Sequence, residues 1–217
     1  LAAQSYPHVS FTNPLETYQT NIDGTENVLS AALKYSPSSI VHVCSSSEVF
    51  GRVPKEKVPI DEETTFHPAS PYAISKCGTD LIGRYYAEAY ELNTQITRMF
   101  THTGPRRGDV FMESTFAKQI ALIENGFQDP VVKVGNLDSM RTIADVRDAV
   151  RAYWLLLNIS PEPGAYYNIG GKKSLKVGEI LKDLIGMSSY KSIEYSVDKD
   201  RLRPIDADLQ IPNTSKF

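Results

Sequence analysis

Apolar positions in the first half of the chain alternate between helical and strand spacing. Between residues 22 and 36 they recur at Val28, Leu29, Ala32 and Leu33, which predicts a helix with one apolar side. Short apolar runs predict buried strands. In order, the expected elements are a helix at 22–36, a strand at 39–44, a proline-rich polar loop at 52–69, a helix at 71–91 and a strand at 95–100. Helices that alternate with strands predict parallel crossovers, and therefore an α/β sheet with helices on both faces.

The pattern changes after residue 108, where the apolar segments become smaller and more mixed. The expected elements are a helix near 114–125, a strand at 131–134, a long helix at 143–158, a strand at 166–169, a helix at 177–186 and a strand at 192–197. The run from Tyr153 to Leu157 is expected to lie in the helix core. Small helices and strands mixed in this way are typical of a subdomain that caps a ligand.

Composition narrows the class of protein. The 217 residues are 41% hydrophobic and 23% charged, which is ordinary for a soluble globular protein. A net charge of −3 argues against a general nucleic-acid binder. No apolar run approaches the length that crosses a bilayer, and no signal peptide is visible, so no membrane association is expected. Cys44 and Cys77 make neither a disulfide framework nor a metal site, which favours a reducing, cytoplasmic location.

The first residues suggest that more of the protein exists. The segment Leu1-Ala2-Ala3-Gln4-Ser5 has no initiator methionine and reads like the end of a buried strand that runs into a loop. A glycine-rich dinucleotide loop is also missing from the sequence. We therefore expect the chain to be a fragment of a longer protein.

The segment Ser70-Pro71-Tyr72-Ala73-Ile74-Ser75-Lys76 carries the strongest chemical signal. Ser70 can cap a helix, and Pro71 suits the first helical position. Tyr72 and Lys76 are four residues apart on one helical face, so the ammonium is expected to lower the pKa of the phenol. Such a tyrosine can take a proton from a sugar hydroxyl while hydride leaves the same carbon.

The same Tyr–Lys spacing occurs once more, at Tyr195 and Lys199. There the tyrosine lies in an expected strand, where residues four apart do not meet as they do on a helix. We therefore interpret Tyr195 as structural and Tyr72 as functional.

A second polar segment, Ser45-Ser46-Ser47-Glu48-Val49-Phe50-Gly51, follows the strand at 39–44. Ligands of open α/β sheets bind beyond the carboxyl ends of the strands, where these hydroxyls and this carboxylate would lie. Taken alone, the segment reads as a serine-rich turn. Because the helix of Tyr72 and Lys76 follows it, we interpret the segment as part of a substrate-binding site.

Together these segments resemble the extended short-chain dehydrogenase/reductase family, the NAD-dependent epimerases and dehydratases of nucleotide sugars. The resemblance covers the whole chain and is closest to its GDP-mannose 4,6-dehydratases and GDP-4-keto-6-deoxymannose reductases. Further matching segments are residues 1–5, Phe100-Thr101-His102-Thr103-Gly104-Pro105-Arg106-Arg107-Gly108, Val134-Gly135-Asn136-Leu137-Asp138-Ser139-Met140-Arg141 and Arg203-Pro204-Ile205-Asp206. It implies a Rossmann-like doubly wound parallel sheet, incomplete at the N-terminus, with a smaller α/β substrate-binding subdomain. Residues 1–105 would carry the cofactor-binding and catalytic part, and residues 106–217 mainly the nucleotide-sugar subdomain.

The resemblance also implies catalytic roles. Ser46 would hydrogen-bond the sugar O4, and Tyr72 would remove the O4 proton while C4 gives hydride to the cofactor. Lys76 would lower the pKa of Tyr72 and hold the nicotinamide ribose. Glu48 would take the proton from C5 and help water leave from C6. This is sound chemistry, because a 4-keto group acidifies the C5 proton.

Binding roles follow from the same resemblance, with NADP expected as cofactor and NAD as the alternative. The implied cofactor-binding residues are Leu1, Ala2, Ala3, Tyr72, Lys76, His102 and Arg107. The implied substrate-binding residues are Ser46, Asn136, Arg141 and Arg203. For Asn136 a simple turn is an equal alternative, and a lone histidine such as His102 is more often structural. No metal is expected, and a homo-oligomer is implied.

The implied reaction converts GDP-mannose to GDP-4-keto-6-deoxymannose by transient oxidation at C4, loss of water across C5–C6 and return of the hydride. The glycine-bounded segment 104–108 and the Ser-x-Glu pattern favour this dehydratase. The short segment between Asn168 and Arg203 is more like the reductase, which stays open as the alternative with other epimerases. A non-catalytic nucleotide-binding fragment is the alternative of another class.

Overall fold

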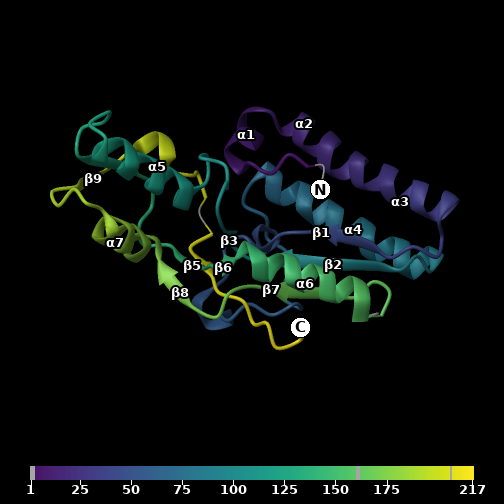
Figure 1. Cartoon of the computed structure of the whole chain (residues 1–217). Coiled ribbons are helices and arrows are strands. Elements are labelled where there is room, and N and C mark those ends of the chain that lie inside the picture. The colour runs from purple at the N-terminus through teal and green to yellow at the C-terminus, as the bar shows by residue number, and fades with distance from the viewer. Residues whose placement is uncertain (1–2, 160–161, 206) are drawn as a thin grey trace.

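The computed structural model describes residues 3–159, 162–205 and 207–217. Its central sheet has three strands, β1 (Val41–Cys44), β2 (Thr94–Met99) and β7 (Tyr166–Ile169), in the order β1-β2-β7. Both neighbouring pairs are parallel (Figure 1). The expected parallel α/β sheet is therefore confirmed, and its third strand comes from the second half of the chain.

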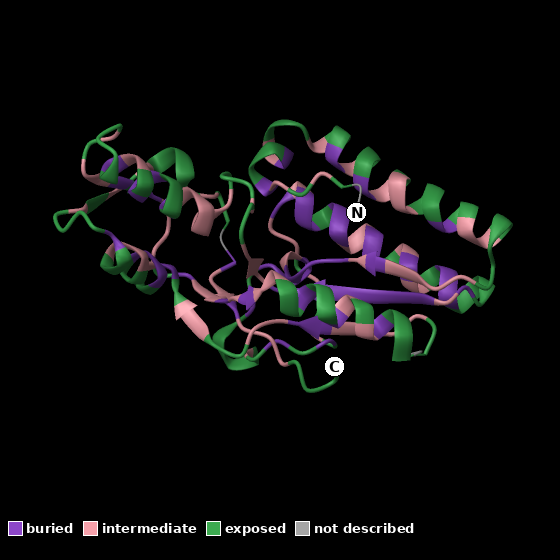
Figure 2. Ribbon diagram, in the orientation of Figure 1, coloured by how far each residue is buried: buried purple, intermediate pink, exposed green. Residues whose placement is uncertain are grey.

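Helices cover both faces of this sheet (Figure 1). Helices α3 (Gly24–Tyr35) and α4 (Pro71–Tyr90) pack on one face, where Leu29, Val43 and Ile96 are buried together. Helix α6 (Val146–Ile159) packs on the other face through Ala149, Ala152 and Leu156. Buried residues consequently concentrate on the sheet and on the helix faces that meet it (Figure 2).

The start of α4 is fixed by side chains as the sequence predicts. The Ser70 hydroxyl accepts a hydrogen bond from the Ala73 amide at 3.0 Å, and Pro71 takes the first turn. A second hydroxyl, that of buried Ser10, accepts from the Tyr72 amide at 3.0 Å. These bonds satisfy amides that a helix start leaves open, so the position of Tyr72 is rigidly set.

The second part of the molecule surrounds a separate apolar core. Helices α5 (Met112–Glu124) and α7 (Val177–Met187) pack over the parallel pair β4 (Val131–Val134) and β9 (Glu194–Val197). The short strands that link the two parts are β3 (His102–Thr103), β5 (Met140–Thr142), β6 (Ala144–Asp145), β8 (Ser174–Lys176) and β10 (Leu209–Gln210). The short 3₁₀ turns are η2 (Ser47–Phe50), η3 (Lys55–Lys57) and η4 (Lys199–Arg201).

The first helical region is longer than the sequence predicts. Helix α1 (Pro7–Thr12) was not expected, and α2 (Pro14–Tyr18) runs through the π-helical turn η1 (Gln19–Asp23) into α3. Polar Asn21 in this turn is buried, and its amide nitrogen donates to the Gln4 carbonyl and the Ser75 hydroxyl. A polar side chain that is buried for tertiary hydrogen bonds breaks the apolar pattern from which a helix is recognised.

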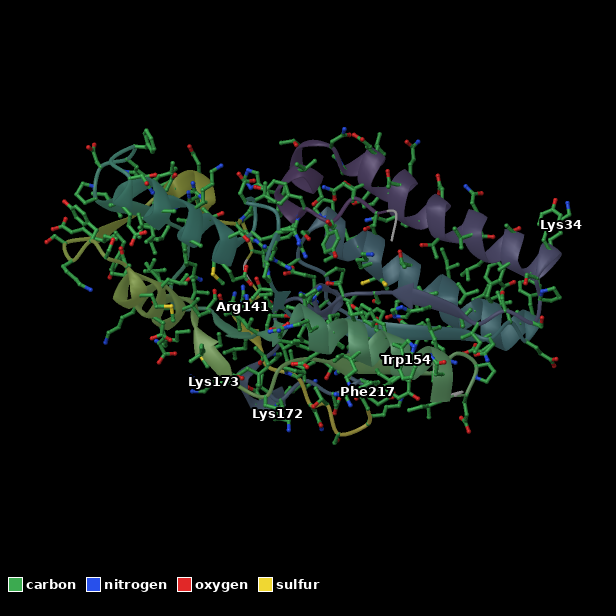
Figure 3. All side chains as sticks on the ribbon, in the orientation of Figure 1. Lys34, Arg141, Trp154, Lys172, Lys173 and Phe217 are labelled. Carbon is green, nitrogen blue, oxygen red and sulfur yellow. The ribbon has the colours of Figure 1, made fainter. Side chains whose placement is uncertain are left out.

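Three predictions of apolar burial are wrong, one of them for Leu157 of the expected helix core, which is 37% exposed. Val28, assigned to the apolar side of its helix, is 59% exposed, and Trp154, assigned to the helix core, is 62% exposed (Figure 3). Among their neighbours Leu29 and Leu156 are buried as expected. The helix face toward the sheet is narrow, so an apolar side chain one or two positions away turns to solvent.

Helix α4 is tied to the sheet by a buried ion pair between Arg98 and Asp80. The Arg98 Nε lies 2.8 Å from Asp80 Oδ2, and its Nη2 lies 3.0 Å from Oδ1. Its Nη1 donates to the Glu62 carbonyl at 2.6 Å, and its guanidinium lies over the rings of Phe50 and Phe66. Both charges are almost inaccessible, at 1% and 0% exposure. The loop before α4 is therefore packed rather than solvated, with Ile60 fully buried.

Replacing Asp80 by alanine is expected to destabilise the protein by about 3–5 kcal/mol, because the Arg98 charge stays buried without its partner. Urea denaturation followed by circular dichroism measures the change. The control is Asp109→Ala, which removes a carboxylate paired with Lys118 on the exposed surface and should change stability little. Equal effects of the two substitutions would contradict the assigned role of the buried pair.

Candidate active site

Two segments bring four of the candidate residues together beyond the carboxyl end of β1. Ser46 and Glu48 lie at the 3₁₀ turn η2, which follows β1 directly, and Tyr72 and Lys76 lie in the first turns of α4. The Ser46 hydroxyl caps the turn by accepting from the Glu48 amide at 3.2 Å. Gly51 ends the turn with a φ of +55°, and a Cβ there would meet the His67 carbonyl oxygen at 1.8 Å. Only glycine permits this compact turn.

The Tyr72 phenol is buried, and the Ser46 side chain lies close enough to affect its pKa. Burial raises the pKa of Tyr72 to about 12, and the nearby Glu48 carboxylate acts in the same direction. The Ser46 hydroxyl and the Arg107 charge oppose this rise in the pKa of Tyr72. Ser46, Glu48 and Tyr72 therefore lie close enough to influence one another, and they are called the Tyr72 group below.

The expected lowering of the Tyr72 pKa by Lys76 is not found. The Lys76 ammonium instead donates to the Cys44 carbonyl at 2.8 Å and lies 5.9 Å from the centre of the Tyr72 ring. Burial also lowers the pKa of Lys76 itself. Spacing along a helix predicts that the two side chains share a face, but it does not include the cost of removing a phenolate from water.

His102 and Arg107 lie on the neighbouring segment, close to this group. Arg107 donates to the His102 carbonyl, stacks on the Phe111 ring at 4.0 Å and faces Glu113 at 3.6 Å. Burial lowers the pKa of His102, and its Nδ1 lies 3.3 Å from the Phe100 carbonyl. Because Arg107 is close enough to influence Tyr72, it extends the same site.

The polar groups around Tyr72 fit a dinucleotide cofactor. The buried Ser45 hydroxyl and Arg107 Nε have no hydrogen-bond partner within the described part of the chain. Lys76 carries three donor hydrogens, and one goes to Cys44. Ribose hydroxyls and phosphate oxygens are the acceptors that such donors select. Of the implied cofactor contacts, Ala3 is exposed, while Leu1 and Ala2 lie outside the described residues.

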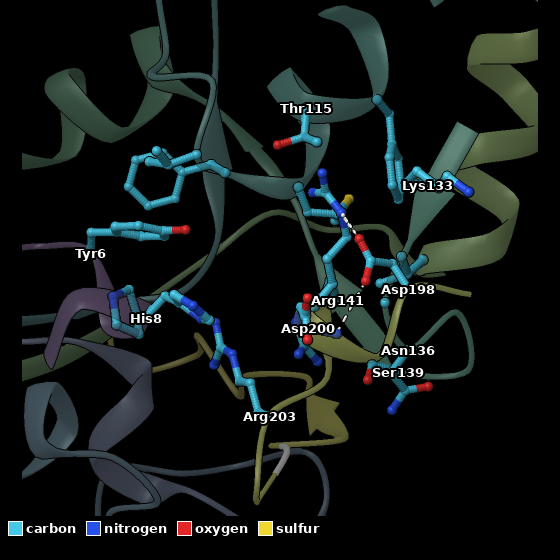
Figure 4. Close-up of a pocket in the computed structure, with 18 residues that line it drawn as sticks. Tyr6, His8, Thr115, Lys133, Asn136, Ser139, Arg141, Asp198, Asp200 and Arg203 are labelled. Carbon is cyan, nitrogen blue, oxygen red and sulfur yellow. Dashed lines mark hydrogen bonds and ion pairs between the residues drawn. The ribbon is translucent and has the colours of Figure 1, made fainter. Parts of the chain in front are cut away.

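A pocket of about 430 Å³ lies beside this group, between the two parts of the molecule (Figure 4). Four segments and Val177 line it, and the segments are residues 6–8, 110–116, 133–141 and 198–203. Tyr6 and His8 lie on one side, Asn136 and Arg141 on the other, and Arg203 between them (Figure 4). Its charged lining residues are Lys133, Arg141, Asp198, Asp200, Arg201 and Arg203. Cations outnumber carboxylates there, which favours an anionic ligand.

Three of the four expected substrate residues, Asn136, Arg141 and Arg203, line this pocket, whereas Ser46 lies beside Tyr72 outside its lining. The Asn136 side chain accepts from the Asp138 amide at 2.9 Å, so the residue both forms a turn and faces the pocket. The Arg141 Nη1 donates to the carbonyls of Met140 and Ala207, which holds its guanidinium at the wall.

The pocket and the Tyr72 group are joined by one ion pair. The Arg203 Nη1 lies 3.3 Å from each carboxylate oxygen of Glu48. Glu48 belongs to the first part of the molecule and Arg203 to the second, 155 positions later in the chain. The site is therefore one continuous surface made by both parts.

Sequence reasoning missed several pocket residues, including Tyr6, His8, Phe111 and Lys133. Tyr6 and Phe111 pack with ring centres 6.3 Å apart, although they are distant in sequence. No local sequence pattern marks such residues, because they come to line one pocket only where the two parts of the molecule meet. The second Tyr–Lys pair is split as expected: Tyr195 is 58% exposed on β9, and Lys199 begins η4.

The structure bears on metal binding and on membrane crossing. Within the described residues, no group of three or more His, Cys, Asp or Glu side chains is placed to hold a metal ion. No described helix combines the length and apolar character that a membrane crossing requires.

Comparison with known proteins extends over the whole chain. The family model described as GDP-mannose 4,6 dehydratase matches residues 1–217. The chain is 33% identical to the GDP-6-deoxy-D-mannose reductase of Pseudomonas aeruginosa, over 94% of the chain and 66% of that protein. It is also 33% identical to GDP-mannose 4,6 dehydratase 1 of Arabidopsis thaliana, over 100% of the chain and 60% of that protein. The chain thus spans less than two thirds of the length of these relatives.

Solved structures agree in fold. RMD from Pseudomonas aeruginosa, complexed with NADPH, superimposes with a TM-score of 0.91 at 30% identity, over the whole chain and 71% of that structure. The UDP-glucose 4-epimerase of Thermotoga maritima, solved with UDP-glucose, gives a TM-score of 0.86 at 26% identity, over the whole chain and 67% of that structure. From its two-part fold, its clustered Ser46, Glu48, Tyr72 and Lys76 and these matches, the chain belongs to the GDP-mannose 4,6-dehydratase family.

Proposed function

We propose that the protein is a nucleotide-sugar dehydratase that converts GDP-mannose to GDP-4-keto-6-deoxymannose with bound NADP, or NAD in its place. The observation that carries this proposal is the position of Glu48. Its carboxylate is close enough to influence the Tyr72 phenol, and it faces the cationic pocket through Arg203. A base for C5 therefore lies between the group that would act on O4 and the pocket that would hold the nucleotide.

The chemistry divides among the residues of the Tyr72 group. When bound, the cofactor would accept hydride from C4 and return it to C6. The Ser46 hydroxyl would orient O4, and Tyr72 would take the O4 proton. Positive charge from Arg107 would stabilise the phenolate that this transfer needs, against the burial that disfavours it, and Lys76 would hold the nicotinamide ribose.

Glu48 would act in the next step. Once C4 carries a ketone, the C5 proton is acidic, and the Glu48 carboxylate would remove it. The protonated Glu48 would then give this proton to the departing C6 hydroxyl, so that water leaves. Proton and hydroxyl leave together as water. When hydride returns to C6, C5 would take up a proton in place of the one that Tyr72 removed from O4, so the sequence of steps consumes no net reductant.

The proposal extends to organisation and location. Residues 1–105 would supply most of the cofactor and catalytic contacts, and residues 106–217 most of the contacts to the GDP-sugar. Cys44 and Cys77 are both free thiols. We therefore extend the proposal to a cytoplasmic protein, where thiols stay reduced.

A reductase of GDP-4-keto-6-deoxymannose is the second candidate. It is favoured by the match to the Pseudomonas aeruginosa reductase, which covers 94% of this chain. That reaction also uses the tyrosine and lysine to handle the O4 proton, but it needs no base at C5. The two candidates therefore differ in what they require of Glu48.

One assay separates the candidates. The full-length protein is incubated with GDP-mannose and a trace of NADP, the sugar nucleotide is followed by mass, and NADPH by absorbance. Loss of one water with no net NADPH supports the dehydratase. Oxidation of NADPH only after addition of the 4-keto-6-deoxy sugar replaces it with the reductase. Inactivity with both substrates contradicts both.

Tyr72→Phe is expected to lower turnover by at least about 100-fold, because the group that exchanges the O4 proton is lost while the fold remains. Steady-state rates with the active substrate, together with a melting curve, give the result. Tyr195→Phe is the matched control, since that tyrosine lies in the other Tyr–Lys pair and should keep normal turnover. Activity of Tyr72→Phe near that of the control would refute the assignment.

Glu48→Gln is expected to block dehydration, with a loss of about 100- to 10,000-fold, because an amide cannot take the C5 proton. Exchange of the C5 hydrogen in D₂O, read by mass, should disappear together with turnover. Transfer of hydride from C4 should survive as NADPH that accumulates on the enzyme. Turnover like that of the unchanged protein would count against the dehydratase and for the reductase.

A further inference from the structure

Arg203 is the residue through which the cationic pocket and the candidate base touch. It belongs to the pocket lining, and its Nη1 lies 3.3 Å from both Oε1 and Oε2 of Glu48. The two side chains are half-buried, with 33% of Arg203 and 17% of Glu48 exposed. A contact this sheltered is screened less by salt than a surface pair, so each partner influences the position of the other.

The surroundings differ on the two sides of Arg203. On the Glu48 side, the nearby titratable groups are the Tyr72 phenol and, farther along, Arg107. On the pocket side are the cations Lys133, Arg141 and Arg201 and the carboxylates of Asp198 and Asp200, and Asp198 pairs with Arg201 at 3.3 Å. An anion in the pocket would therefore meet several cations, of which Arg203 is the one that also holds a carboxylate of the Tyr72 group.

We infer that Arg203 is a positioning residue with two alternative partners, Glu48 when the pocket is empty and the diphosphate of a nucleotide when it is filled. A diphosphate offers more charge and more acceptor oxygens than one carboxylate, and the guanidinium fork matches both. Filling the pocket thus draws Arg203 away from Glu48 and releases the carboxylate to act as a base. The inference rests on the proposed function in taking the pocket ligand to be a nucleoside diphosphate and Glu48 to be the base.

A measurable coupling follows from this exchange. Nucleotide binding must break the Arg203–Glu48 pair, so the pair opposes binding by its own strength. A partly exposed ion pair of this kind changes affinity by about two- to fivefold. Removing the Glu48 charge should therefore tighten nucleotide binding, although the base itself would act on the sugar and not on the nucleotide.

The test measures the dissociation constant of GDP by isothermal titration calorimetry, with the full-length protein and a double-mutant cycle. Glu48→Gln is expected to bind GDP about two- to fivefold more tightly than the unchanged protein. Arg203→Gln should bind it more weakly, and adding Glu48→Gln to Arg203→Gln should bring no further gain. Arg203→Lys gives a second version of the cycle if the glutamine variant does not fold. Asp138→Asn is the control, because it removes an exposed carboxylate that pairs with Lys176.

Two results would overturn the inference. One is unchanged GDP affinity in Glu48→Gln; the other is a gain that persists without Arg203 or that Asp138→Asn reproduces, since general loss of negative charge would then explain it. Failure of GDP to bind the unchanged protein would overturn the nucleotide pocket as well. A coupled cycle in a protein that does not dehydrate GDP-mannose would uphold the exchange and refute only the proposed reaction.

Discussion

The buried pair of Arg98 and Asp80 is the constraint on which the site depends. Asp80 belongs to α4, which carries Tyr72 and Lys76, and Arg98 belongs to the central strand β2. The same guanidinium lies over the ring of Phe50 in the turn that carries Glu48. One buried cation therefore sets the distance between the two segments that supply the reactive side chains. Charge is costly to bury, so this arrangement tolerates little displacement.

The site itself depends on an approach between two separately packed parts. The sheet with α3, α4 and α6 has its own apolar clusters, and α5, α7, β4 and β9 enclose another. Neither part holds both the Tyr72 group and the pocket. The ion pair of Glu48 and Arg203 connects the two parts. Because Arg203 also lines the pocket, the relative position of the parts is sensitive to the ligand in it.

Much of the fold and part of the site could be predicted from the sequence, because those features are local. Helix α4 begins where Ser70 and Pro71 predict, and the five expected strands begin and end within two residues of their predicted bounds. The short strands β3, β5, β6, β8 and β10 are not predicted by any apolar run. The chemical environment could not be predicted in the same way. The pKa of Tyr72 is raised because neighbours from distant segments bury it, and spacing to Lys76 does not report burial. The pocket residues Tyr6 and Lys133 escaped detection for the same reason.

The first turn of α4 has a consequence for how ligand preference can change. Pro71 has no amide hydrogen, and the amides of Tyr72, Ala73 and Ile74 are bonded to Ser10, to the Ser70 hydroxyl and to the Ser70 carbonyl. The positive end of this helix is thus already saturated, so side chains rather than its amides would recognise an anion beside it. Such side chains can be exchanged one at a time without rebuilding the backbone. Point substitutions of these side chains can therefore change which substrate is bound, while the backbone of α4 keeps Tyr72 in place.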